Sequence, residues 1–119
     1  MKVLIIDDDI DALTSISFLL TINGFIVDTE PLWQNTFNKI HLFNPDLILL
    51  DINLRGEDGR NISQQIKTTP DCQHIHIILF SAHVTFQSDL KGSLADDFIG
   101  KPFEVKELIE KINYRYSKN

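Results

Sequence analysis

The feature that most constrains the fold is an apolar run at residues 47–54, which reads LILLDINL. Pro45 precedes this run, and Gly56 and Gly59 follow it, so its length is that of a single strand. An uninterrupted apolar run of this kind is typical of a strand buried on both faces of a sheet. The run therefore predicts a central strand with Asp51 at its carboxyl end. Ligands bind at that edge of open α/β sheets, which makes Asp51 the first candidate functional residue.

The composition indicates an ordinary single globular domain. The chain has 119 residues, 43% of them hydrophobic, which is enough for a core without disulfides or a structural metal. Its 17 acidic residues outnumber 11 scattered basic residues, so we expect no nucleic-acid surface. We also expect no membrane contact and a cytoplasmic location, because no apolar run resembles a membrane span or a signal peptide. The single cysteine, Cys72, is expected to be a plain loop thiol.

Short apolar runs alternate with segments of helical periodicity. The predicted strands are 2–6, 25–27, 47–51, 74–80 and 97–99. The predicted helices are 10–22, 31–43, 59–69, 84–94 and 103–116. This alternation predicts a doubly wound α/β fold, in which five helices cover both faces of a five-stranded parallel sheet. We predict one domain over residues 1–119. The helix at 84–94 is the least certain element, because it has few apolar residues and Gly92 interrupts it.

Polar side chains stand where four of the predicted strands end. They are Asp7 and Asp8, then Asp51, Ser81 and Lys101. Right-handed crossovers bring these strand ends to one edge of the sheet. Three carboxylates meeting there repel one another, so either their pKa values rise or a cation joins them. Oxygen ligands suit Mg²⁺, and the pattern predicts metal-assisted phosphoryl transfer.

Four motifs, IIDDD, LLDINLRGEDG, FSA and DDFIGKPF, resemble in order and spacing the signature patches of response-regulator receiver domains of two-component signalling. The likeness covers the whole chain, and the chain resembles single-domain chemotaxis-type regulators. It implies a flavodoxin-like fold with strand order 2-1-3-4-5. It also implies that Asp51 is the phosphoacceptor, which attacks the phosphohistidine of a sensor histidine kinase or a histidine phosphotransfer protein. The chain would then be a signalling module that promotes only its own phosphotransfer and dephosphorylation.

The resemblance implies a ligand set for Mg²⁺. Asp8 and Asp51 would bind the ion directly, together with the Asn53 backbone carbonyl, and Asp7 would bind mainly through water. By the same likeness, Asn53 and His83 stand where the family tunes the hydrolysis of the acyl phosphate.

The remaining implied roles concern the switch. Ser81 would hydrogen-bond a phosphoryl oxygen, and Lys101 would pair with it as a point charge. Phe98 would change rotamer as the Ser81 loop moves. A cis peptide bond would precede Pro102.

The chain departs from the family pattern at three places. From Ser81 to Lys101 is 20 residues, about two fewer than the resemblance implies, so we expect a short or irregular fourth helix. Arg55 stands where many receivers have proline, so we expect a more mobile loop over the site. Leu94 stands where the family has a glycine that ends the fourth helix in a left-handed conformation. The fourth helix, fifth strand and fifth helix commonly form the output face. Changes in the fourth helix therefore bear on the choice of output protein, which is unknown, and on a possible homodimer through that face.

An alternative class is a Mg²⁺-dependent phosphatase of the haloacid dehalogenase kind, with Asp7 as nucleophile and Asp9 as acid. Asp11 stands where that family has Thr or Val, and the chain is short for that fold. The simpler role for Asp9 is to cap the first helix.

A further alternative is a receiver that no longer uses phosphate and binds a partner constitutively. Against it, all five side chains expected of an active receiver are present. We expect no effector domain in this chain. Met1 and the brief polar tail at 117–119 favour a single-domain regulator over a receiver excised from a longer protein.

Overall fold

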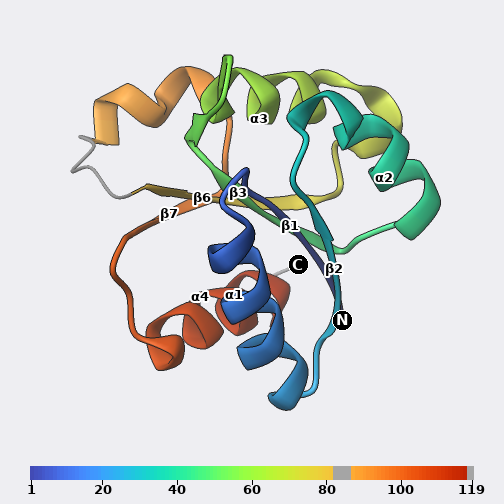
Figure 1. Ribbon diagram of the computed structural model, residues 1–119. Coiled ribbons are helices and arrows are strands. Elements are labelled where there is room, and N and C mark those ends of the chain that lie inside the picture. Colours follow the sequence, from blue (N-terminus) through green and yellow to red (C-terminus); the bar gives the residue numbers. More distant parts are fainter. Residues whose placement is uncertain (82–86, 118–119) are drawn as a thin grey trace.

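The computed structural model describes residues 1–81 and 87–117 and shows a sheet between two layers of helices (Figure 1). The five strands run parallel in the order β2-β1-β3-β6-β7, which confirms the predicted 2-1-3-4-5 topology. Their bounds are β1 (Lys2–Ile6), β2 (Ile26–Glu30), β3 (Leu47–Asp51), β6 (His76–Ser81) and β7 (Asp97–Gly100). Every residue of β3 is buried, as its uninterrupted apolar sequence predicts.

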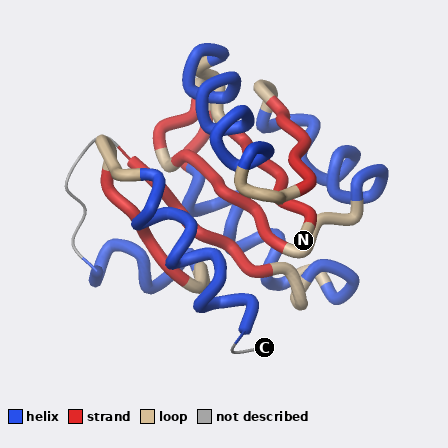
Figure 2. The backbone as a smooth tube through the Cα atoms, turned by 90° about the horizontal axis from the view of Figure 1, so that it is seen from below, coloured by secondary structure: helices blue, strands red, loops and turns tan. Residues whose placement is uncertain are grey.

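Helices cover both faces of the sheet. They are α1 (Ile10–Ile22), α2 (Thr36–Phe43), α3 (Gly59–Thr68) and α4 (Val105–Ser117). In Figure 1, α2 and α3 lie above the sheet and α1 and α4 below it. Leu4 and Ile6 of β1 belong to the upper core, while Val3 and Ile5 belong to the lower one, because alternate side chains of a strand point to opposite faces. Seen from below, α4 crosses in front of the strands (Figure 2).

The predicted fourth helix is a short 3₁₀-helix, η3 (Gln87–Ser93), so the described residues hold four α-helices rather than five. This agrees with the expectation of a short or irregular element. The next residue, Leu94, has φ 60° and takes the left-handed conformation although it has a Cβ atom. The first residues of the predicted helix 84–94 and His83 lie outside the described residues. The fifth predicted helix is α4, which begins at Val105 rather than at residue 103.

Two other elements differ from the prediction. β2 continues to Glu30 because it pairs with β1 over five residues, from Lys2 opposite Ile26 to Ile6 opposite Glu30. A 3₁₀-turn, η1 (Trp33–Asn35), precedes α2, which therefore starts later than predicted.

Cys72 lies in another 3₁₀-turn, η2 (Pro70–Cys72), in the connection between α3 and β6, and is buried. Its burial raises the pKa of the thiol. None of the helices in the ranges that the structure describes is long and apolar enough to span a membrane.

A small antiparallel hairpin follows β3, and the sequence analysis did not predict it. It consists of β4 (Asn53–Leu54) and β5 (Glu57–Asp58), with Gly56 at φ 83° in the turn. α3 begins directly after the hairpin, at Gly59. A Cβ atom at Gly59 would lie 2.1 Å from the Asp51 carbonyl oxygen, so only glycine lets the helix start this close to the end of β3.

The amino-terminal edge of the sheet is closed by an ion pair. Lys67 Nζ lies 3.0 Å from Asp96 Oδ2 and donates also to the carbonyl oxygens of Gln73 and Ile75. The same Asp96 oxygen accepts the Ile77 N–H at 2.8 Å. This network joins the end of α3 to the starts of β6 and β7.

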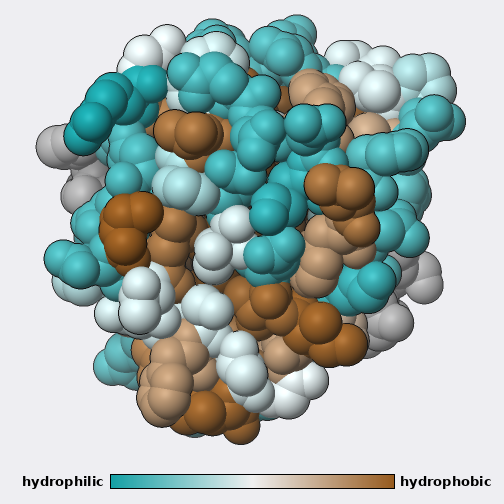
Figure 3. Space-filling model, turned by 45° about the vertical axis from the view of Figure 1, so that its right-hand side comes forward, coloured by the Kyte–Doolittle hydropathy of each residue, from teal (hydrophilic) through white to brown (hydrophobic). Residues whose placement is uncertain are grey.

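One side of the molecule keeps apolar side chains exposed. Ile10, Phe18 and Ile22 of α1 are each more than half exposed, at 59%, 64% and 62%. Figure 3 shows apolar side chains between hydrophilic ones on this side, most densely in its lower half. Leu32, in the loop after β2, is also 59% exposed.

Candidate functional site

The site lies at the carboxyl edge of the sheet, where β1 and β3 end side by side. Ile6 pairs with Leu50, so the following residues, Asp7 and Asp51, leave the sheet at the same level. Asp7 is fully buried and Asp51 is 5% exposed. Carboxylate oxygens of Asp7, Asp8 and Asp51 all lie within 4.8 Å of one another. The structure thus brings together the three acidic residues that the sequence places at strand ends.

Lys101 joins these carboxylates from β7. Its Nζ is 3.1 Å from Asp7 Oδ2 and 3.8 Å from Asp51 Oδ2. It also lies 4.3 Å above the centre of the Phe80 ring, which helps to hold the ammonium group over the site. The Lys101 main-chain N–H donates to the Ser81 carbonyl at 2.7 Å, and the Lys101–Pro102 peptide is cis.

The electrostatics of the site centre on Asp51. Burial, and next the charge of Asp7, raise the pKa of Asp51 to about 7, although Lys101 and the Asn53 N–H act in the opposite direction. The Asn53 N–H donates to Asp51 Oδ1 at 3.2 Å. Two buried carboxylates share one nearby ammonium group, so the negative charge at this edge is only partly neutralised.

The donor set fits a hard divalent cation. Each of the three converging residues offers a carboxylate oxygen, and hard cations such as Mg²⁺ prefer oxygen ligands. A cation beside them would offset the repulsion that raises the pKa of Asp51. Asp7, Asp8 and Asp51 are the residues that could hold it, and the Asn53 carbonyl stays a predicted ligand.

The predicted switch residues lie on β6 and β7. Ser81 ends β6 and is 1% exposed, and its Oγ accepts a hydrogen bond from Asn53 Nδ2 at 2.9 Å. Phe98 is half-buried on β7, opposite Leu79 of β6, and packs against the upper core. The Asn53 side chain therefore links the hairpin to Ser81, a contact that the sequence analysis missed.

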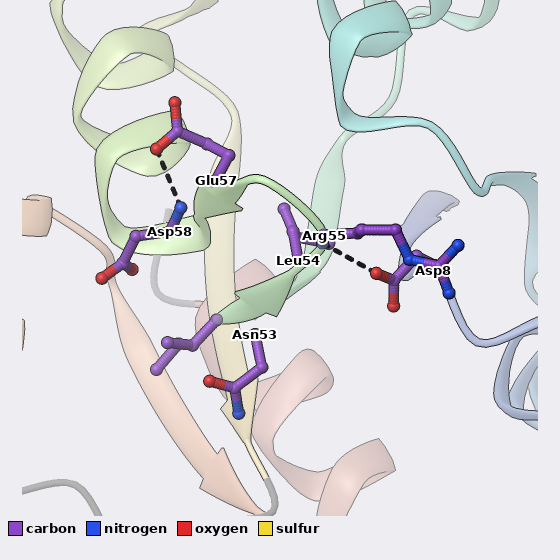
Figure 4. A pocket seen from close by; sticks show the side chains of 7 residues that line it. Asp8, Asn53, Leu54, Arg55, Glu57 and Asp58 are labelled. Carbon is purple, nitrogen blue, oxygen red and sulfur yellow. Dashed lines mark hydrogen bonds between the residues drawn. The ribbon is translucent and has the colours of Figure 1, made fainter.

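The hairpin contains a second connection that the sequence analysis missed. The main-chain N–H of Arg55 donates to Asp8 Oδ2 at 2.7 Å (Figure 4), and Trp33 Nε1 donates to the Arg55 carbonyl at 2.9 Å. The loop was expected to move more because Arg55 replaces proline, yet both main-chain polar groups of Arg55 are held. The only signal in the sequence is that a non-proline residue at 55 retains its N–H.

A pocket of about 440 Å³ opens beside this connection. Asp8 forms one wall and the hairpin, including Asn53, Arg55 and Glu57, forms the other (Figure 4). Of the three converging carboxylates, Asp8 is the one that lines this pocket.

Comparisons with known proteins agree with this geometry. Residues 3–113 match the family model described as the response regulator receiver domain. The chain is 37% identical over 115 residues to the sensory transduction protein LytR of Staphylococcus haemolyticus, covering 95% of this chain and 44% of that protein. It is 30% identical over 113 residues to the cell cycle transcriptional regulator CtrA of Caulobacter vibrioides, covering 95% of this chain and 49% of that one. The chain spans about half the length of the curated relatives it matches.

Solved structures share the whole fold. A CheY-like response regulator receiver domain protein from Methanospirillum hungatei superposes with a TM-score of 0.86 at 25% identity, over 98% of this chain and 94% of that one. A two-component response regulator from Clostridium difficile gives a TM-score of 0.85 at 28% identity, over 96% of this chain and 93% of that one.

Proposed function

The chain belongs to the response regulator receiver family, a family of signalling modules rather than enzymes, and we propose that Asp51 is its phosphoacceptor. In this proposal, Asp51 takes a phosphoryl group from a phosphohistidine in the presence of Mg²⁺, and the product switches a partner-binding face. One observation carries the proposal. Asp51 ends the central strand within reach of Asp7, Asp8 and Lys101, the set that phosphoryl transfer to a carboxylate needs.

The transfer is a displacement at phosphorus. A carboxylate oxygen of Asp51 forms the new P–O bond while the P–N bond to the donor imidazole breaks. The imidazole nitrogen leaves with the electron pair and takes up a proton. Lys101 lies between Asp7 and Asp51, where its ammonium group can pair with a phosphoryl oxygen. Mg²⁺, when bound, would supply positive charge against the phosphoryl oxygens.

The switch begins at Ser81. Its hydroxyl would leave the Asn53 amide and donate to a phosphoryl oxygen, and Phe98 would follow the movement of the Ser81 loop. The affected surface would be the η3, β7 and α4 face, which we propose as the contact for an output protein or a second copy. We also propose that the chain acts by protein contact, as a single domain.

The donor is a protein. Receiver membership implies a histidine kinase partner. A histidine phosphotransfer protein is a proposed alternative, and the proposed location of this chain is the cytoplasm. Exposed Ile10 and Leu32 line a groove that also contains Asp8. Apolar side chains this close to the acceptor site suit a docking protein.

The test is phosphoryl uptake from acetyl phosphate, measured by intact mass with and without Mg²⁺. We expect the wild type to gain one phosphoryl group only with Mg²⁺, and Asp51→Asn to gain none. Asp71→Asn, at an exposed carboxylate on η2, is the matched control and should be labelled like the wild type. No gain in the wild type with any donor would contradict the proposal and would favour the constitutive binding module.

A further inference from the structure

We propose that Arg55, through its main-chain N–H, is a positioning residue for the cation ligand Asp8, so that cation binding and the Asn53–Asp58 hairpin are coupled. This inference rests on the proposed function, because it assumes that Asp8 binds the cation. It assigns a role to a position where many family members have proline and therefore no N–H.

The first argument is the bond itself. The Arg55 nitrogen lies 2.7 Å from Asp8 Oδ2, a short distance that is typical of an N–H donating to a charged carboxylate. A carboxylate has two oxygens, so one can accept this N–H while the other binds a cation. Groups that hold a metal ligand in this way fix its orientation and its affinity for the metal.

The second argument is that the opposite side of Arg55 is also held. Its carbonyl accepts the Trp33 indole N–H at 2.9 Å. The Trp33 loop is fixed in turn by Glu30, which is 4% exposed and accepts the Leu32 N–H and the Asn35 amide, each at 3.0 Å. The hairpin therefore bridges two loops, one after β1 and one after β2.

The third argument is the position of the bond between two cavities. Asp8 and Arg55 line both the pocket beside the hairpin and the groove that runs past Trp33. Both residues of the hydrogen bond therefore border both spaces. Moving Asp8 toward a cation would therefore pull on the hairpin and on the indole that contacts it.

The experiment compares Arg55→Pro with Arg55→Ala. Both variants lose the guanidinium group, but only Arg55→Pro loses the N–H. Mg²⁺ is titrated while the fluorescence of Trp33, the only tryptophan in the chain, is recorded. We expect Mg²⁺ affinity to fall about tenfold in Arg55→Pro, as for other groups that orient a metal ligand, and to stay close to the wild type in Arg55→Ala. The Mg²⁺-dependent rise in Tm gives the same comparison without fluorescence.

A second measurement covers the case in which Arg55→Pro does not fold. In the wild type, the amide resonance of Arg55 and the indole N–H resonance of Trp33 are followed by NMR during the Mg²⁺ titration. We expect both to shift with the same midpoint as the fluorescence. An Arg55 amide that does not respond to saturating Mg²⁺ would overturn the inference.

The outcomes separate the inference from the proposed function. Equal Mg²⁺ affinity in Arg55→Pro and Arg55→Ala would overturn the positioning role and leave the Mg²⁺ site in place. A wild type that shows neither a fluorescence change nor a rise in Tm with Mg²⁺ would overturn both, since no cation would bind at the acidic residues.

Discussion

Both edges of the sheet hold titratable side chains that are buried or half-buried, but they balance the charge in opposite ways. At the amino edge, Asp96 is matched by one ammonium group, from Lys67, and by the Ile77 N–H. At the carboxyl edge, Lys101 is the one ammonium group that the described residues bring to Asp7 and Asp51, while Asp8 lies close by. The amino edge is electrostatically complete, and the carboxyl edge carries excess negative charge.

The difference indicates what each edge is for. The matched, half-buried pair of Lys67 and Asp96 joins three elements and leaves no charge unpaired within it. An unmatched set of carboxylates costs stability until a cation or a proton joins it, and a site that binds a cation and a phosphoryl group requires that imbalance. The same residue types therefore stabilise the fold at one edge and equip the other for binding.

The largest effect is expected from breaking the matched edge. Asp96→Ala leaves Lys67 without its carboxylate and the Ile77 N–H without its acceptor, and should lower the free energy of unfolding by about 2–3 kcal/mol. Urea denaturation measures it. Asp71→Ala, at an exposed carboxylate, should change stability by less than about 0.5 kcal/mol. An unchanged free energy of unfolding in Asp96→Ala would mean that this network contributes nothing to stability.

At the unmatched edge, stability should depend on pH through Asp51. Its folded pKa of about 7 lies above the unfolded value of 3.8, so the folded state binds the proton more tightly. The stabilisation from this proton is complete below the unfolded pKa and is lost as the pH rises through about 7. Without divalent cations, the stability of the wild type relative to Asp51→Asn should therefore fall by about 2.5 kcal/mol between pH 5 and pH 8. Thermal unfolding of both proteins across this range checks the sign, and a constant difference between them would refute it.

Near the amino edge, the conformation of Leu94 lowers the stability of the fold. Its φ of 60° strains a residue with a Cβ, and its side chain is 48% exposed, so little burial would be lost on removing it. Leu94→Gly should raise the free energy of unfolding by about 0.5–1 kcal/mol, as measured in urea. Leu94→Ala keeps the Cβ and the strain, and should bring no such gain. Equal effects of the two variants would show that the left-handed backbone carries no cost.

The smallest effect concerns a hydrogen bond at the binding edge that the proposed switch has to break. Asn53→Ala removes the amide that holds the Ser81 hydroxyl at 2.9 Å. Affinity for beryllofluoride, a phosphoryl mimic, should then rise by about fivefold or less, since one neutral hydrogen bond contributes about 1 kcal/mol. Titration in the presence of Mg²⁺ measures it, and Asn61→Ala, on the exposed side of α3, is the matched control. Unchanged or weaker binding would show that Asn53 does not oppose the switch.

The sequence was sufficient to predict the five strands of the main sheet and the convergence of the polar residues that follow them. The runs around β1 and β3 are long enough to identify as strands, and parallel pairing of neighbours then puts Asp7 and Asp51 at one level. The hairpin was not predictable, because strands of two residues have no periodicity to detect. The bonds of Arg55 use main-chain groups that every residue except proline has, so its identity shows only that the N–H is present.

The ends of several helices and strands were also not predictable from the sequence. β2 extends beyond its apolar residues because β1 provides main-chain partners as far as Glu30, whatever the side chains are. η3 replaces an α-helix where the sequence around Gly92 offers few apolar residues to bury. In both places, partners elsewhere in the fold decide the structure.

The contact between Gly59 and the end of β3 has a consequence for sequence variation. A Cβ at Gly59 would collide with the Asp51 carbonyl, whereas a Cβ at Gly92 or Gly100 would meet nothing within 4 Å. In a library that replaces every residue in turn, alanine should be tolerated at the latter two sites and depleted at the first. A glycine that touches no ligand would then score in such a screen like a residue of the binding site, because the backbone that carries the acceptor leaves no room for a methyl group.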